Sequence, residues 1–446
     1  MSVLMRSVSG IRGIVGDSLT VDTLVSHVWA FLKVTQAKSI VLGRDSRPTG
    51  EAICELVSGV CRMAGVSVID VGLSTTPTVE LMVETCMADG GIIITASHNP
   101  IEWNALKFLN AKGMFLGPAE VKSLFAIADA GGFSWPGWQA MGTRSSRQDA
   151  DQIHIDGVLA LSVVDVAKIR TARFKVAVDA VNGAGSHIVP QLLRALGCDV
   201  VEVFCTPNGH FPRGAEPLPE NLVALGDAVR KNGCAVGFAL DPDADRCALV
   251  DSLGRSVGEE YTLALATDTV LDRLKGPVCI NLSTSRMNED VAERHGQKCF
   301  RSAVGEINVS LEMIAQKCVM GGEGNGGTIL PALHYGRDSL VACALVLDWM
   351  ARYGKRVEDW VSSNPAYSMP KKKYQLGARP VAEVLEQVSA RFRDWNQDTR
   401  DGLWLGKDKV WLHVRASNTE PVIRVIAEAP DALEAEALCA QVEAFL

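Results

Sequence analysis

Three aspartates alternate along one short loop of the sequence, LDPDADRC. Asp241, Asp243 and Asp245 directly follow the apolar run AVGFAL, so a loop at the end of a strand can turn all three carboxylates toward one point. Three converging hard oxygen ligands suit Mg²⁺ or Ca²⁺. The loop is not an EF-hand, because Arg246 stands where glycine is needed and Ser252 where a bidentate glutamate is needed. The pattern predicts a divalent-metal site, with the planar cation of Arg246 beside it. The alternative is a solvated acidic turn.

A second polar cluster ends the run GIIITASHNP, residues 91–100. The isoleucines predict a strand, and Ser97, His98 and Asn99 fall in the bend that follows it. The G-x-S-x-G pattern of a nucleophile elbow is absent, and neighbouring side chains on an extended chain point apart, which argues against a Ser–His catalytic pair. Two interpretations remain: a serine hydroxyl held in a rigid bend for phosphorylation, or a capping serine and histidine at a strand-to-helix turn.

The stretch VRASNTEPVIRV, residues 414–425, has the composition of an anion site. Arg415 ends one predicted strand, Arg424 lies on the next, and Ser417, Asn418 and Thr419 occupy the turn between them. Two guanidinium groups around small hydrogen-bonding side chains and backbone N–H groups predict a receptor for one phosphate. The alternative is an ordinary hairpin with two surface arginines.

The stretch MGGEGNGGTILP, residues 320–331, has five glycines in seven positions around Glu323 and Asn325. Glycine allows the backbone to approach a ligand closely, and a carboxylate and an amide are natural partners for sugar hydroxyls. No GK[ST] follows, so the stretch is not a Walker loop. The alternative interpretation is a flexible surface loop.

The elements that must position these loops repeat along the chain. A β-branched run that ends in a polar loop and is followed by a helical stretch occurs in SIVLGRDSRPTG, FKVAVDAVNGAG and CAVGFALDPDADR. Apolar strands alternating with helices predict the α/β class, with mixed sheets between helices. In such folds the polar chemistry gathers at the carboxyl ends of the strands.

Changes in composition divide the chain into four predicted domains. The segment 131–156 is rich in Gly, Ser and Trp, a new helical unit begins after Asp251, and SSNPAYSMPKKKYQL contains two prolines. The first three domains are predicted to be α/β and the last a smaller α+β domain of strand, helix, two strands (within 402–417 and 421–428) and helix. In order they carry the serine, metal, glycine-rich and phosphate loops, and their predicted bounds are 1–148, 149–251, 252–366 and 367–446.

The bulk composition excludes several classes of protein. The chain has 446 residues, 47% hydrophobic and 22% charged, with a net charge of −8 and no basic run beyond Lys371–Lys373, so no nucleic-acid footprint is indicated. No secretory signal and no apolar run approaching ~18 residues is present, which predicts a cytoplasmic protein without membrane contact. The twelve scattered cysteines favour free thiols over a disulfide or zinc framework.

Five motifs taken together resemble the α-D-phosphohexomutase family, in the order and at the spacing of that family. They are SGIRG (9–13), TASHNP (95–100), DPDADR (241–246), GEGNGG (322–327) and RASNTEP (415–421). The resemblance covers essentially the whole chain and implies a reversible phosphosugar mutase with its active cleft between four domains. SGIRG, GEGNGG and AVGEINV (303–309) look most like the phosphoglucosamine mutase-type members.

The resemblance also implies a role for each loop. Ser97 would carry a phosphoryl group and, with Asp241, Asp243 and Asp245, would hold Mg²⁺. Arg12, Lys107 and Arg246 would surround the transferring group with positive charge. Glu323 and Asn325 would face sugar hydroxyls, and the phosphate that is not reacting would be held by Arg415, Ser417, Asn418, Thr419 and Arg424.

The implied reaction moves a phosphoryl group between the 6- and 1-positions of a hexose or hexosamine phosphate. It proceeds through phosphoserine and a 1,6-bisphosphate, which is also the activator. Glucosamine 6-phosphate is the expected substrate, with phosphomannomutase or phosphoglucomutase activity as the alternative. A silent phosphosugar-binding protein and a metal-dependent phosphatase are the alternatives of other classes, and the protein is expected to be a monomer or a homodimer.

The general base is left open by one departure from the family pattern. Members specialised for mannose and glucose phosphates often have Ser-Gly-His in the sugar loop, whereas this chain has Asn325 followed by two glycines. Lys107 and His98 are therefore the candidates for the base. His334, in LHYGRD, is a further one.

Overall fold

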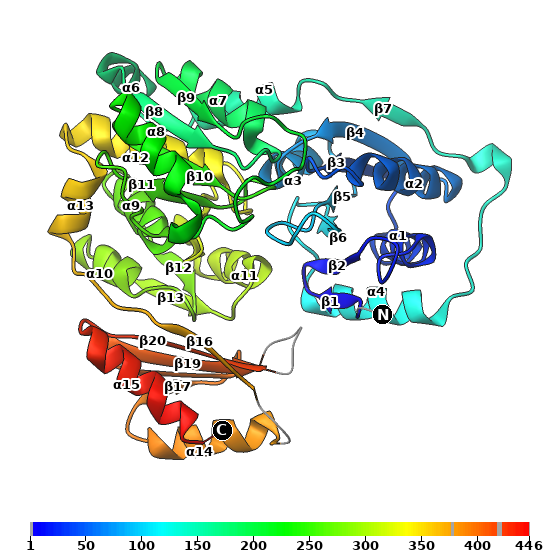
Figure 1. The fold of residues 1–446 in the computed structure, drawn as a ribbon. Helices are drawn as coiled ribbons and strands as arrows, with labels where there is room; N and C mark the ends of the chain where they lie inside the picture. Colours follow the sequence, from blue (N-terminus) through cyan, green and yellow to red (C-terminus); the bar gives the residue numbers. More distant parts are fainter. Residues whose placement is uncertain (1–2, 376–378, 417–421, 446) are drawn as a thin grey trace.

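Four β-sheets follow one another along the chain (Figure 1). The computed structural model describes residues 3–375, 379–416 and 422–445. Its first three sheets are mixed and carry helices, and the fourth is antiparallel with two helices, α14 and α15. The prediction of an α/β fold with a distinct C-terminal part is confirmed.

The first sheet has the strand order β1-β2-β6-β5-β3-β4-β7. Ile92 and Ile94 of β5 belong to one hydrophobic core and Ile93 belongs to another, on the opposite face of the sheet. This strand is therefore buried on both faces, which explains its unbroken apolar sequence. The elements are β1 (Met5–Ser7), β2 (Gly10–Ile14), α1 (Val21–Thr35), β3 (Ser39–Arg44), α2 (Gly50–Met63), β4 (Ser67–Leu73), α3 (Thr76–Thr85), β5 (Gly90–Ile94), β6 (Trp103–Asn110), α4 (Pro118–Ala130), a 3₁₀ turn (Trp138–Ala140) and β7 (Arg144–Ser146).

The second and third sheets have the same design, three parallel strands and one antiparallel edge strand, in the orders β11-β10-β8-β9 and β13-β12-β14-β15. The second comprises α5 (Ala150–Leu159), α6 (Val166–Ala172), β8 (Lys175–Asp179), α7 (Gly185–Ala195), β9 (Asp199–Val203), a 3₁₀ turn (Pro219–Asn221), α8 (Val223–Asn232), β10 (Val236–Leu240) and β11 (Cys247–Val250). The third comprises α9 (Glu259–Leu271), β12 (Val278–Asn281), α10 (Met287–Arg294), β13 (Cys299–Ser302), α11 (Glu306–Gln316), β14 (Met320–Glu323), β15 (Gly327–Ile329), α12 (Ser339–Tyr353) and α13 (Val357–Ser363).

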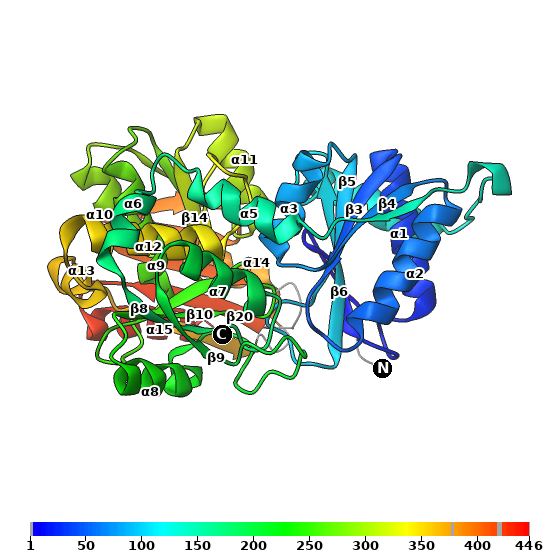
Figure 2. The same ribbon diagram turned by 90° about the horizontal axis from the view of Figure 1, so that it is seen from above.

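One hydrophobic core joins these two sheets, and Figure 2 shows both on the opposite side of the molecule from the first sheet. Helix α12 runs through that core, because every residue from Ser339 to Met350 is buried. The apolar stretch SLVACALVLDWM is thus an internal helix. Among the described residues, no helix has the length and apolar character that crossing a bilayer requires.

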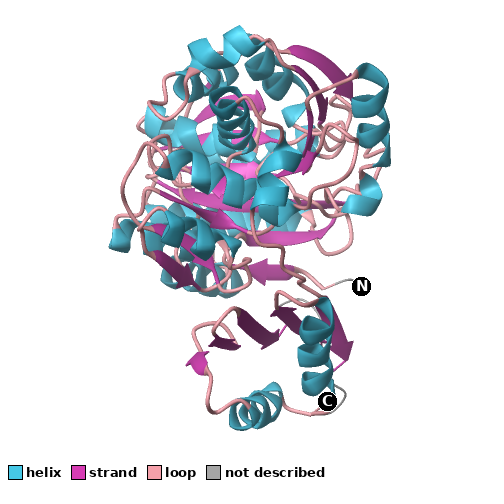
Figure 3. Cartoon of the chain, turned by 90° about the vertical axis from the view of Figure 1, so that its left-hand side faces the viewer, coloured by secondary structure: helices cyan, strands magenta, loops and turns pink. Residues whose placement is uncertain are grey.

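The fourth sheet has the order β16-β20-β19-β18-β17 and is set apart from the rest of the molecule (Figure 3). Its elements are β16 (Lys371–Gln375), α14 (Val381–Arg391), β17 (Asn396–Asp398), β18 (Leu403–Lys407), β19 (Val410–Ala416), β20 (Val422–Glu428) and α15 (Ala432–Glu443). In place of the one strand expected within 402–417, the described residues of this segment form two, β18 and β19. Asp408, at a φ of 52°, turns the chain between β18 and β19.

His413 of β19 joins the fourth sheet to the third. Its Nε2 lies 2.7 Å from the carbonyl oxygen of Asp401, which can only accept, so Nε2 carries the proton. Its Nδ1, 2.8 Å from the Ser283 hydroxyl, then accepts a hydrogen bond. The imidazole is completely buried, and burial lowers the pKa of His413 to about 4.

Acidification is expected to destabilise the protein through His413. Its folded pKa of about 4 lies below the ordinary value of 6.5, so the unfolded chain binds more protons between these values. The contribution of His413 is complete above pH 6.5 and falls by up to about 1.4 kcal/mol per pH unit as the pH drops toward 4. Chemical unfolding at several pH values in this window should show that the free energy of unfolding depends less steeply on pH in His413→Gln than in wild type. The exposed His210 gives the control His210→Gln, and an equal slope in both variants would refute the assignment.

Candidate active site

A cleft of about 690 Å³ lies where the four sheets meet. This volume is in the usual range for a small-molecule site, about 300–1,000 Å³. The loops after β5, β10 and β14 reach it, as does the cleft-facing side of the fourth sheet. The predicted site residues that line it are Arg12, Ser97, His98, Lys107, Arg246, Glu323, Asn325, Arg415 and Arg424.

The serine loop is held in a fixed bend by a buried arginine. Arg47 donates hydrogen bonds to the carbonyl oxygens of Ser97 and Asn99, both at 2.7 Å. The same guanidinium pairs with Asp45 at 3.1 Å, and both side chains are fully buried. Thr95 accepts the backbone N–H of Ser97 at 3.0 Å. Sequence reasoning missed Asp45 and Arg47, although both lie in the stretch GRDSR of one of the repeated strand-loop units.

Ser97 and His98 do meet, contrary to the interpretation that their side chains point apart. The Ser97 Oγ lies 3.3 Å from His98 Nδ1, because Ser97 has a φ of 48° and is not extended. The positive charge of Arg246, followed by burial, lowers the pKa of His98 to about 2, so this imidazole is neutral. The Ser97 hydroxyl can instead donate to Asp241 Oδ2, at 3.0 Å. The serine therefore lies between a neutral imidazole and the aspartate loop.

The three aspartates converge as predicted. Asp241, Asp243 and Asp245 are completely buried, and one carboxylate oxygen of each lies within 4.8 Å of those of the other two. Burial, and next the neighbouring carboxylates, raise the pKa of Asp241 well above its ordinary value. Within the part of the chain that the structure describes, Asp243 Oδ1 and Asp245 Oδ1 have no hydrogen-bond partner. Arg246 Nε lies 3.7 Å from Asp245 Oδ1. Buried carboxylate oxygens without a hydrogen-bond donor, beside a serine hydroxyl, fit a hard divalent cation.

The second carboxylate oxygen of Asp243 is held by residues of α3 and β6. Asp243 Oδ2 accepts from the Thr76 hydroxyl and from Lys107 Nζ, both at 2.7 Å. Burial alone would raise the pKa of Asp243, but Lys107 holds it far below its ordinary range. Lys107 is itself buried, so its amine is committed to the metal loop. These contacts fix the orientation of the Asp243 carboxylate and hence of its free oxygen, Oδ1.

Arg337 connects the metal loop to the glycine-rich loop. Its three guanidinium nitrogens reach Asp245 at 2.5 Å, Glu323 at 2.8 Å and Glu306 at 2.8 Å. A planar fork suits three carboxylates at once, which a lysine could not match. Sequence reasoning missed Arg337 and Glu306. The available signal was the occurrence of two adjacent charged residues, Arg337 and Asp338, directly before the apolar helix α12.

The glycine-rich loop packs directly on the metal loop. Gly326 has a φ of 83°, and a Cβ there would lie 2.3 Å from the carbonyl oxygen of Cys247, so no larger residue fits. The Glu323 carboxylate also accepts from Asn281 at 2.8 Å and from the backbone N–H of Gly305 at 2.9 Å. Asn325 is half-buried and lines the cleft. The loop is therefore a fixed wall of the cleft.

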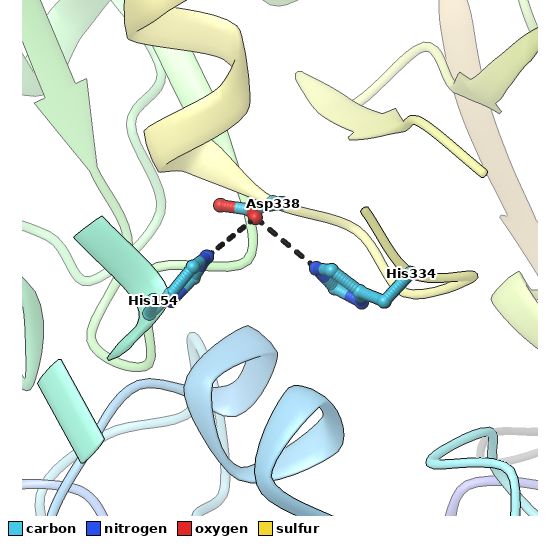
Figure 4. Close-up of side chains that lie close together, drawn as sticks. All are labelled: His154, His334 and Asp338. Carbon is cyan, nitrogen blue, oxygen red and sulfur yellow. Dashed lines mark hydrogen bonds and ion pairs between the residues drawn. The ribbon is translucent and has the colours of Figure 1, made fainter. Parts of the chain in front are cut away.

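His334 lies in a buried cluster and does not line the cleft (Figure 4). The Nε2 atoms of His334 and His154 lie 3.1 and 2.8 Å from the same Asp338 oxygen. Gly336 N–H donates to His334 Nδ1, so His334 Nε2 must carry the proton and cannot ligate a metal. Thr78 lies 2.9 Å from His154 Nδ1. The cluster links α3, α5 and α12, and the structure does not bring His334 to the other predicted residues.

The two predicted phosphate-binding arginines lie side by side. Arg415 of β19 is directly opposite Arg424 of β20, and both line the cleft. Arg12 also lines the cleft, and its Nη1 donates to the Asn99 side chain at 2.5 Å. Ser417, Asn418 and Thr419 lie outside the described residues.

Four family models match the chain in succession. All four describe domains of "Phosphoglucomutase/phosphomannomutase". Alpha/beta/alpha domains I, II and III match residues 5–134, 152–254 and 258–367, and the C-terminal domain matches residues 379–445. The chain belongs to this family. It is a phosphohexomutase, an enzyme of the isomerase type.

Relatives of similar length support this assignment. A phosphoglucomutase/phosphomannomutase of Thermococcus kodakarensis is 37% identical over 434 residues, covering 94% of this chain and 93% of that protein. A probable phosphoglucosamine mutase of Methanopyrus kandleri is 33% identical over 426 residues, covering 94% and 93%. The two names point to different substrates within one reaction class.

Solved structures show the same fold over the whole phosphohexomutase chain. A family protein of Burkholderia thailandensis matches with a TM-score of 0.85 at 25% identity, covering 99% of this chain and 98% of that one. A phosphomannomutase structure of Thermus thermophilus, named as putative, matches with a TM-score of 0.82 at 23% identity, covering 99% of each chain. The domain boundaries predicted from the sequence stay predictions.

Proposed function

We propose that the enzyme interconverts glucosamine 6-phosphate and glucosamine 1-phosphate, with Ser97 as the phosphoryl carrier. One observation carries the proposal: the Ser97 hydroxyl lines the cleft and lies 3.0 Å from Asp241 Oδ2, in the loop where Asp243 Oδ1 and Asp245 Oδ1 have no hydrogen-bond donor among the described residues. A relative of Pyrococcus abyssi, 31% identical over 440 residues, is also named a probable phosphoglucosamine mutase, which supports this substrate. The T. kodakarensis relative supports the alternative, a glucose or mannose phosphate.

Mg²⁺ is the proposed metal, held by Asp241, Asp243 and Asp245 together with Ser97. When bound, it would offset negative charge on the transferring phosphoryl group. A solved N-acetylphosphoglucosamine mutase of Aspergillus fumigatus is in complex with GlcNAc-6P and magnesium. It shares the fold at 15% identity, and the donor set of this chain suits the same ion.

The chain's own side chains would position the transfer. The bond between phosphorus and Ser97 Oγ breaks as a bond to the free sugar hydroxyl forms, and the hydroxyl proton passes to a base. Arg12 and Arg246 line the cleft and would balance the charge of the phosphoserine, about −1.5 to −2. His98 and Lys107 both stay predictions for the base, because the Lys107 amine donates to Asp243 and the positive charge of Arg246 lowers the pKa of His98.

The bisphosphate must then present its other phosphate to Ser97. Arg415 and Arg424 would hold whichever phosphate is not reacting, and Glu323 and Asn325 would face the sugar hydroxyls. The 1,6-bisphosphate also serves as activator, because it phosphorylates Ser97 in enzyme that has lost its phosphate. Whether the enzyme is a monomer or a homodimer stays a prediction.

A side-by-side assay of glucosamine, glucose and mannose 6-phosphates tests the proposal, with catalytic amounts of the matching 1,6-bisphosphate and Mg²⁺ present. The expected result is the highest kcat/KM for glucosamine 6-phosphate. A higher kcat/KM for glucose or mannose 6-phosphate would favour the alternative substrates. Release of inorganic phosphate faster than isomer formation would indicate a phosphatase, and tight binding without turnover a silent binding protein.

A further inference from the structure

A third cation lies in register with the two phosphate-site arginines. Lys373 of β16 is directly opposite Arg424 of β20, which is directly opposite Arg415 of β19. Residues directly opposite one another in neighbouring antiparallel strands project from the same face of the sheet. All three residues line the cleft. They form a cationic row across three adjacent strands.

The other two lysines of the run Lys371–Lys373 already have partners. Lys371 pairs with Glu259 at 3.2 Å and with Glu260 at 3.6 Å, on helix α9. Lys372 also borders the cleft, but it alternates with Lys373 along β16 and its amine pairs with Glu436 of α15 at 3.0 Å. Lys373 makes no ion pair with any described residue. Among the described residues, the run KKK therefore has two lysines paired with glutamates and one, Lys373, without an ion pair and directly opposite Arg424.

The row is electrostatically unfavourable without an anion. Side chains directly opposite in an antiparallel pair have Cβ atoms about 4.5–5.5 Å apart, and like charges at that spacing destabilise a sheet. Within the described residues Arg424 also lacks an ion pair, and Arg415 has one carboxylate near it, Asp401 at 3.5 Å. Because Asp401 offsets part of the Arg415 charge, two arginines alone would leave a phosphate dianion incompletely balanced. A third cation restores the balance.

We infer that Lys373 binds the non-reacting phosphate of the sugar, together with Arg415 and Arg424. The inference rests on the proposed function, since it assigns a residue to the phosphate-holding end of that cleft. Lysine suits the task because its ammonium group is a compact charge on a flexible stem, whereas the arginine forks are planar. One site must accept the phosphate from either the 6- or the 1-end of the sugar, and a flexible donor can follow that change.

Steady-state kinetics of Lys373→Met against Lys372→Met test the inference. The two variants remove the same charge from adjacent residues on opposite faces of one strand. The substrate is glucosamine 6-phosphate, or whichever 6-phosphate wild type converts. Lys373→Met is expected to raise KM about tenfold, which is the effect of losing one hydrogen bond to a charged group. Its kcat should stay within about twofold of wild type. Lys372→Met should leave KM within about twofold of wild type.

Two further measurements separate the alternatives. Lys373→Met should melt at least as high as wild type without ligand, because it removes a like-charge contact, so a raised KM cannot be ascribed to misfolding. Calorimetric titration with inorganic phosphate should show binding weakened about tenfold in Lys373→Met but not in Lys372→Met. Equal KM and equal phosphate affinity in the two variants overturn the inference. Absence of turnover in wild type overturns the proposed function instead, and the phosphate titration still decides the role of Lys373.

Discussion

Ser97→Ala is expected to lower mutase turnover by a factor on the order of 10³ or more, because the variant has no oxygen to carry the phosphoryl group. The fold should be retained. The position has a φ of 48°, and alanine adopts that conformation at a cost similar to that of serine. The bend is held through the backbone carbonyls that Arg47 contacts, which the substitution leaves in place. Turnover is measured with 6-phosphate substrate, 1,6-bisphosphate and Mg²⁺.

The control for this variant is Ser58→Ala. Ser58 is a buried serine of α2 whose hydroxyl has no hydrogen-bond partner among the described residues. Its replacement should leave kcat and KM unchanged. If Ser97→Ala kept more than about a tenth of wild-type turnover, a factor of ten being about 1.4 kcal/mol, Ser97 would not be the carrier.

Asp241→Asn is expected to make the metal-free protein at least as stable as wild type and to remove most of its Mg²⁺ affinity. Burial and the neighbouring carboxylates raise the pKa of Asp241, so its ionised form is disfavoured in the fold, and a neutral isostere removes that cost. The amide oxygen can still accept the backbone N–H of Arg246. Loss of one anionic ligand should weaken Mg²⁺ binding by about a hundredfold or more and reduce turnover in parallel.

Calorimetric titration with Mg²⁺ and thermal unfolding in a chelator measure the two effects. Asp199→Asn is the matched control, since the Asp199 side chain is 72% exposed and lies at the start of β9. It should change neither Mg²⁺ affinity nor turnover. Unchanged Mg²⁺ affinity in Asp241→Asn would mean that the three aspartates are not the metal site.

The sequence was sufficient for the parts of the site that depend on local pattern. Alternating carboxylates after an apolar strand predicted the convergence of Asp241, Asp243 and Asp245, because the end of a strand and a short loop leave little freedom. The isoleucine run before Ser97 likewise predicted a buried strand. In both cases the chemistry follows within a few residues of the element that positions it.

Sequence reasoning failed where the outcome depended on a single backbone angle or on distant partners. The contact between Ser97 and His98 depends on the φ of Ser97, which no composition pattern encodes. Arg337 owes its role to Asp245 and Glu323, and the first of these is 92 positions away in the sequence. Lys373 joins the cationic row only through the register of β16 against β20. A local motif describes neither a single backbone angle, nor the register of two strands, nor the packing of one sheet against another.

The central claim is that one phosphoryl group resides on Ser97 during turnover. Intact-protein mass spectrometry with peptide mapping tests it, after incubation with 1,6-bisphosphate and Mg²⁺ and again after addition of excess 6-phosphate. The account predicts at most one phosphate per chain, mapped to Ser97, transferred to the sugar when 6-phosphate is added, and absent from Ser97→Ala. A phosphate mapped to another residue, or mutase turnover by a chain that never becomes phosphorylated, would contradict it.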